Sequence, residues 1–163
     1  NEVYFLLGKE RGGRDKGTWA CLGGKIDPTD PSKKYAACRE AHEESAGILG
    51  TTEEIAKRVF SLNGSNHTYL MEIKDPTALT NKKFLAARAK QKDHHFREMT
   101  ELKWMKASDL VDACANNNGV FAFDSNQGKE EKIRPYVNRI ITRNQKYLKT
   151  KKFINEKKES SFQ

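Results

Sequence analysis

The chain has 163 residues, of which 36% are hydrophobic and 32% are charged, which is enough for one globular domain with a buried core. Its apolar runs are shorter than the roughly 18–20 residues of a membrane span, and no signal-peptide pattern precedes the first apolar segment. These features argue against a membrane-spanning protein and predict a cytoplasmic one. The net charge of +8 favours a partner rich in phosphate, such as a nucleotide or RNA.

The first third of the chain predicts two strands followed by a helix. Val3–Lys9 is apolar and partly β-branched or aromatic, and an extended run resumes at Thr18–Leu22 after a basic, glycine-rich loop. Asp30 and Pro31 predict a helix start, with an acceptor at the N-cap and proline at the first helical position. Residues 31–45 contain no glycine, and Gly47 can end the helix in the left-handed conformation.

The remainder of the chain predicts alternating strands and helices. Two strands, Val59–Leu62 and Thr68–Ile73, flank the turn sequence NGSN. The later predicted elements are a helix over Asn81–Lys92, a strand over Leu102–Met105, a helix from an N-cap at Ser108 to about Ala115, and a helical apolar stripe within Lys129–Thr142. We therefore expect an α/β fold of the α+β sandwich type, with a central mixed β-sheet between helices. Residues 1–145 would form the domain, and residues 146–163 a lysine-rich, basic C-terminal tail.

Cysteines and histidines do not predict a metal site. The three cysteines, Cys21, Cys38 and Cys114, form no CxxC pair, so free reduced thiols are expected. His94 and His95 are adjacent and do not share a helix face, and no zinc-binding spacing occurs.

Three glutamates of the first predicted helix favour a hard divalent cation. Glu40, Glu43 and Glu44 stand at positions i, i+3 and i+4, so their side chains fall within one narrow arc. By themselves they favour an ordinary solvated acidic face. Carboxylates on successive turns can also hold Mg²⁺, which prefers oxygen ligands and is often completed by substrate phosphates.

The segment around these glutamates, GGKIDPTDPSKKYAACREAHEESAGI at residues 23–48, resembles the signature of the Nudix hydrolase family. That signature is Gly-x5-Glu-x7-Arg-Glu-U-x-Glu-Glu-x-Gly-U, where U is apolar. Its leading glycine is similar to Gly24, and its closing pair to Gly47 and Ile48. The matching central block consists of Arg39, Glu40, Ala41, Glu43 and Glu44.

The match has departures on both sides of the central block. Asp30 stands in the first glutamate slot, with one additional residue before Arg39, and a second additional residue lies between Glu44 and Gly47. Leu22 replaces the proline that commonly precedes the Gly-Gly pair. None of these changes alters the spacing from Arg39 to Glu44.

The resemblance implies the Nudix fold and a pyrophosphohydrolase that requires Mg²⁺, with Mn²⁺ as a substitute. The implied metal ligands are Glu40, Glu43, Glu44 and a backbone carbonyl at Gly23 or Gly24. Arg39 would orient a carboxylate. The base that activates water would be a glutamate of the signature, Glu43 or Glu44, or a later one, for which the candidates are Glu98 and Glu101.

The substrate is less well defined. The resemblance implies a nucleoside diphosphate linked to another group, such as a nucleotide derivative, a dinucleoside polyphosphate or capped RNA. Candidate phosphate-binding residues are Arg11, Arg14, Lys16, Gly23 and Lys25, although the first three also suit a solvated hairpin tip. The basic tail, with Arg134 and Arg139, could guide RNA.

Two other functions share the same residues. The departures from the signature are compatible with a catalytically weak Nudix-fold module that binds nucleotides or RNA. A metal-assisted isomerase of the isopentenyl diphosphate isomerase kind is a third alternative, although no well-placed cysteine–glutamate pair supports it.

Overall fold

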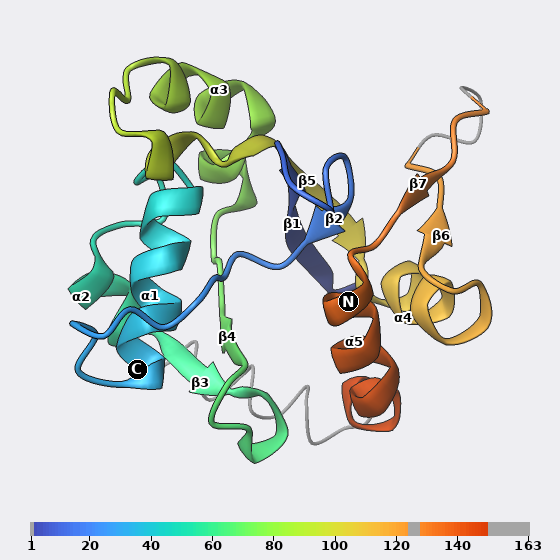
Figure 1. Ribbon diagram of the computed structural model, residues 1–163. Helices are drawn as coiled ribbons and strands as arrows, with labels where there is room; N and C mark the ends of the chain where they lie inside the picture. Colours follow the sequence, from blue (N-terminus) through green and yellow to red (C-terminus); the bar gives the residue numbers. More distant parts are fainter. Residues whose placement is uncertain (1, 124–127, 150–163) are drawn as a thin grey trace.

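The computed structural model describes residues 2–123 and 128–149. Its largest sheet has three antiparallel strands in the order β2-β1-β5, formed by Trp19–Ala20, Tyr4–Glu10 and Met99–Lys106 (Figure 1). The pairing of β1 with β5 runs from Tyr4 opposite Lys106 to Lys9 opposite Glu101, with an irregularity between Lys9 and Glu10. The predicted strands therefore form, and β5 is longer than the predicted Leu102–Met105.

Two short antiparallel hairpins lie beside this sheet. In the first, β3 (Val59–Ser61) and β4 (Tyr69–Met71) flank the predicted turn, where Asn63 has a left-handed φ of 49°. In the second, β6 (Val120–Phe121) pairs with β7 (Glu131–Lys132). The predicted central mixed sheet is wrong: the ladders of the described residues are antiparallel, and their parallel pairing is limited to the isolated bridge between Trp19 and Ile133.

The helices are α1 (Lys33–Glu44), α2 (Thr52–Ala56), α3 (Asn81–Ala89), α4 (Ala107–Asn116) and α5 (Pro135–Leu148), with short 3-10 turns at Leu62–Gly64, Pro76–Leu79 and His94–Arg97. The unpredicted α2 carries a capping box between Thr51 and Glu54, a signal that the sequence contained. The protein thus combines helices with small antiparallel sheets, which is the α+β class.

Two predicted helix starts are wrong. The N-cap of α1 is Ser32, whose hydroxyl accepts a hydrogen bond from the N–H of Tyr35 at 3.1 Å. The carboxylate of Asp30 does not cap the helix because it binds Arg39. The predicted cap Ser108 lies inside α4, which begins at Ala107 directly after β5.

The last helix is displaced from its predicted range. Residues 131–132 are in β7, and α5 starts at Pro135, whose fixed φ and missing N–H suit a first helical turn. Tyr147 and Leu148 are buried in the larger core cluster, so the predicted domain boundary at residue 145 falls within α5. The lysines of the predicted tail at positions 151, 152, 157 and 158 lie outside the described residues.

Two core clusters hold these elements together. The larger one joins the sheet to α4 and α5 and includes Leu7, Trp19 and Ile133, all fully buried. The smaller one lies under α3 and contains Phe84, Met99, Leu102 and Ala46. It packs α3 against β5, and Figure 1 shows α3 near the start of that strand. Within the described part of the chain, no helix combines the length and apolarity that crossing a membrane requires.

Candidate metal centre

The last two turns of α1 carry two carboxylates in the same direction. Glu40 and Glu44 are one turn apart, and helix geometry places such residues on one face. Glu44 is only 3% exposed, and its Oε2 accepts a hydrogen bond from the N–H of Gly23 at 2.6 Å. The Gly-Gly segment after β2 therefore lies directly against the acidic face of α1.

Glu98 brings a third carboxylate to this face. It follows the 3-10 turn at His94–Arg97 and precedes β5, and its carbonyl accepts the N–H of Arg11 at 3.0 Å. One carboxylate oxygen from each of Glu40, Glu44 and Glu98 lies within 4.8 Å of the others. The three oxygens converge from two elements that are distant in sequence.

Two carboxyl groups of this cluster, those of Glu44 and Glu40, have raised pKa values. Burial raises the pKa of Glu44 to about 9, and the N–H of Gly23 only partly opposes this, while the charges of Glu10, Glu40 and Glu98 raise it further. Burial also raises the pKa of Glu40, although Arg39 lowers it. Three oxygen donors that repel one another are the chemistry that a hard divalent cation stabilises. The three carboxylates could therefore hold a hard divalent cation.

Arg39 is the cation that the chain itself supplies to this region. Its Nε and Nη2 bind the two carboxylate oxygens of Asp30, each at 2.9 Å, and Nη2 also donates to the carbonyl of Lys25 at 3.2 Å. Its Nη1 reaches Glu40 at 3.1 Å and Glu43 at 3.3 Å. This bidentate pair lowers the pKa of Asp30. Asp30 thus fixes Arg39 against the acidic helix despite the additional residue between them.

The residue between Glu44 and Gly47 that is additional to the Nudix signature lies after the acidic cluster. Ala46 and Gly47 both have left-handed φ values, 53° and 81°, and α1 ends at Glu44. The additional residue is therefore absorbed in the turn after the helix. The register that places Glu40 and Glu44 on one face is unchanged.

Two predicted site residues are not brought into the cluster. The carboxylate of Glu43 binds Arg39 and is not among the three convergent carboxylates. Glu101 lies opposite Lys9 in the sheet and pairs with its ammonium group at 3.6 Å. Of the two later candidates for the base, only Glu98 reaches the cluster.

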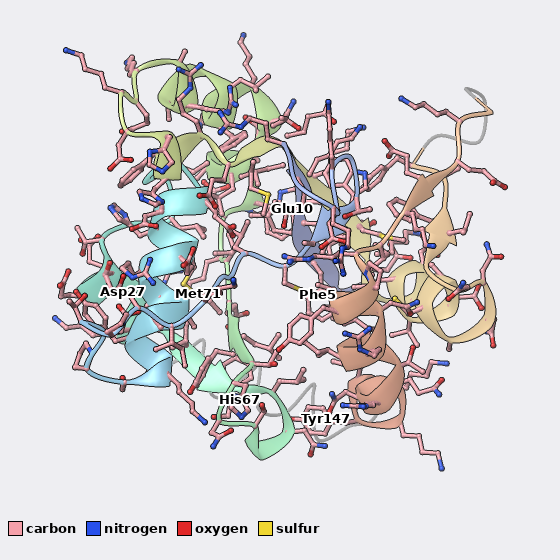
Figure 2. All side chains as sticks on the ribbon, viewed as in Figure 1. Phe5, Glu10, Asp27, His67, Met71 and Tyr147 are labelled. Carbon is pink, nitrogen blue, oxygen red and sulfur yellow. The ribbon has the colours of Figure 1, made fainter. Side chains whose placement is uncertain are left out.

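Glu10 is a carboxylate near the cluster that sequence reasoning missed. It is the last residue of β1, the central strand of the sheet, and is labelled in Figure 2. Burial raises its pKa, and the nearby charge of Glu98 contributes. Arg134 binds Glu10 through Nη1 at 3.1 Å and Asp15 through Nε at 2.9 Å. A lone glutamate at a strand end carries no sequence signal for this position.

The predicted phosphate-binding residues lie in different structural environments. Gly23 contacts Glu44 through its N–H, and the carbonyl of Lys25 contacts Arg39. Arg11 is joined to Glu98 only through the backbone. The side chain of Arg14 is exposed, and Lys16 lines a surface pocket with Lys129 and Lys132. Only the Gly23–Lys25 segment is placed directly against the cluster.

Gly24 has a steric reason to be glycine. A Cβ at this position would collide with the carboxyl group of Glu40, whereas a Cβ at Gly23 would meet no atom within 4 Å. We expect Gly24→Ala to weaken Mg²⁺ affinity by about 10–100-fold, the range for changes that displace a metal ligand indirectly, with Gly23→Ala as the matched control. Calorimetric titration with Mg²⁺ measures both, and equal affinities would contradict this placement.

The histidines were not expected to cluster, yet two of them lie together. The 3-10 turn places the rings of His94 and His95 4.0 Å apart, and Asp93 joins them in an exposed group of closely spaced ligand atoms. His95 Nδ1 also lies 3.5 Å from Glu98 Oε1. The carboxylate cluster remains the more enclosed of the two groups.

Comparisons of the chain with models of protein families, with curated proteins and with solved structures found no match.

Proposed function

We propose that this protein is a Mg²⁺-dependent pyrophosphohydrolase with a Nudix-type fold and active site. Its substrate would contain a diphosphate linkage between a nucleoside and another group. The observation that carries the proposal is the convergence of Glu40, Glu44 and Glu98 within 4.8 Å beside Gly23 and Gly24. Closely spaced carboxylate oxygens suit a divalent cation, whose coordination substrate phosphates can complete.

The residues of the cluster have different roles in this proposal. Glu40 and Glu44 hold the cation, Arg39 orients Glu40, and the N–H of Gly23 orients Glu44. A bound Mg²⁺ supplies Lewis-acid polarisation of the diphosphate and favours ionisation of water. Glu98, whose side chain is 41% exposed, is open to solvent and accepts the proton of the attacking water. The water oxygen forms a bond to phosphorus as the anhydride P–O bond breaks.

The geometry favours a hydrolase over a catalytically weak binding module. The module was an alternative because Asp30 and the residue after Glu44 depart from the family signature. Asp30 nevertheless binds Arg39 through both oxygens, and the residue after Glu44 is absorbed outside the helix. These contacts support an intact cation-binding arrangement.

The direct test is hydrolysis of diphosphate compounds in Mg²⁺ or Mn²⁺, with EDTA as the metal-free control. Nucleotide sugars, dinucleoside polyphosphates and capped RNA should be compared, because α5 exposes Arg139, Arg143 and Lys146 and basic side chains favour an RNA chain. Mass spectrometry in ¹⁸O-labelled water identifies the phosphorus that is attacked. Failure to cleave any of these with either cation would contradict the proposed activity.

The role of Glu98 has its own matched test. We expect Glu98→Gln to lower turnover by about 100–10,000-fold, the usual contribution of a general base, because the amide cannot accept the proton. Glu101→Gln, on the same segment but paired with Lys9, should retain nearly full turnover. Steady-state kinetics at saturating Mg²⁺ compare the two, and a larger loss in the Glu101 variant would exchange their roles.

A further inference from the structure

A cavity of about 650 Å³ separates β1 from β4. The two strands belong to different sheets, and Phe5 of β1 and Met71 of β4 are labelled on either side of this region in Figure 2. The helices α1 and α5 supply further lining, including Ala36, Ala37, Val137 and Ile140. The cavity is therefore bounded by two strands, by largely apolar helix surfaces and by residues 21–26, with Lys33 and Arg134 among its charged lining residues.

The edge of β4 that does not face β3 has free backbone groups. The N–H of Leu62 donates to the carbonyl of Thr68 at 2.9 Å, and in an antiparallel ladder every second residue pair is hydrogen-bonded. Phe60 and Leu70 form the next such pair. The N–H and C=O groups of Tyr69 and Met71 therefore point away from β3, and nothing in the described residues pairs with them.

β1 presents a similar edge beyond the end of β2. The N–H of Ala107 donates to the carbonyl of Val3 at 2.8 Å, so the same alternation directs the backbone groups of Tyr4, Leu6 and Gly8 away from β5. Gly8 lies opposite Ala20, the last residue of β2. Within residues 2–123 and 128–149, no partner continues this ladder opposite Tyr4 and Leu6.

We propose that the cavity is the docking site of one extended peptide strand from a partner polypeptide. One edge of that strand would hydrogen-bond to Tyr4 and Leu6, and its other edge to Tyr69 and Met71. Strand addition of this kind derives affinity from main-chain hydrogen bonds and specificity from side-chain pockets. The added strand would join β3, β4, β1 and β5 into one sheet.

The walls define the chemistry of the partner. A strand with both edges paired and with its side chains against apolar helices needs a nearly continuous apolar run, rich in valine or isoleucine. Proline is excluded because it cannot donate to a ladder. The short open edges at Tyr4–Leu6 and Tyr69–Met71 limit the inserted part to about five residues.

The test is amide hydrogen exchange of the full chain with a synthetic peptide, Val-Ile-Val-Ile-Val flanked by lysines. At saturating peptide we expect exchange at Tyr4, Leu6, Tyr69 and Met71 to slow by at least about tenfold, with little change at Leu70, which is already paired. Two control peptides carry N-methyl groups on alternate residues, so that each has lost the donors of one edge. Each control should bind at least about tenfold more weakly.

A cavity variant provides an independent arm. Ala37→Phe places a ring in the cavity and should abolish the peptide effect, whereas Lys34→Phe adds the same ring at an exposed position of α1 and should preserve it. Circular dichroism checks that both variants fold. If Ala37→Phe does not fold, the comparison with the N-methylated peptides still tests the proposal. The proposal is overturned by slow exchange of the four amides in the free protein, by exchange unaffected by peptide, or by undiminished binding of both methylated peptides.

Discussion

Glu44→Gln should abolish metal-dependent diphosphate cleavage and lower Mg²⁺ affinity by more than about 100-fold, the upper range for residues that only support a ligand. The amide keeps the size of Glu44 but removes the charge of the most buried carboxylate in the cluster. It also changes the group that accepts the N–H of Gly23. Mg²⁺ titration calorimetry and initial rates of cleavage measure the two effects separately.

Glu43→Gln is the matched comparison, because the two glutamates are adjacent on α1. Glu43 contacts Arg39 at 3.3 Å and lies outside the convergent group, so we expect at most about a tenfold loss of Mg²⁺ affinity. The family resemblance by itself implies equivalent ligands. Equal and large losses in both variants would restore that equivalence and contradict the geometry described above.

In the absence of divalent cations, the free energy of unfolding should fall as pH rises from about 5 to 9. The pKa of Glu44 is raised from 4.5 to about 9 in the folded protein, so within this window the native state holds a proton that the unfolded chain has released. Stability therefore decreases with pH, by up to about 1.4 kcal/mol per pH unit for one group. Urea unfolding in EDTA at several pH values measures the slope.

The Glu44→Gln variant isolates this contribution. It should be close to the wild type in stability near pH 5 and more stable than the wild type near pH 9, because the glutamine has no proton to lose. Saturating Mg²⁺ should flatten or reverse the wild-type slope, since the cation binds the ionised carboxylate of the native state. A wild-type slope that persists unchanged in Glu44→Gln would assign the effect to other groups, such as Glu10 and Glu40, whose pKa values are also raised by burial.

The ion pairs of Arg134 relate the C-terminal helix to the candidate centre. Arg134 precedes α5 and binds both Glu10 and Asp15, and its N–H donates to the carbonyl of Trp19 at 2.8 Å. These contacts fix the basic loop after β1 and partly neutralise Glu10 beside the cluster. The predicted use of Arg134 in guiding RNA therefore competes with a positioning role that the described contacts support directly.

The sequence by itself determined local features of the molecule, namely helix faces, turns and individual helices. Helical periodicity by itself placed Glu40 and Glu44 on one face, because residues one turn apart point in nearly the same direction. The turn at Asn63–Gly64 and the helix α3 were likewise predictable, since turn chemistry and helix propensity act over a few residues.

Only the tertiary structure decided which groups meet those two carboxylates. The approach of Glu98, the exclusion of Glu43 and Glu101, and the position of Glu10 depend on how the 3-10 turn at His94–Arg97 packs against α1 and on how β1 pairs with β5. Spacing in sequence does not encode this packing. The direction of strand pairing and the capping of α1 by Ser32 in place of Asp30 were decided in the same way, because Asp30 forms a stronger, bidentate contact with Arg39. Charge and helical period thus set the chemistry available to the site, and long-range packing selected the residues that assemble it.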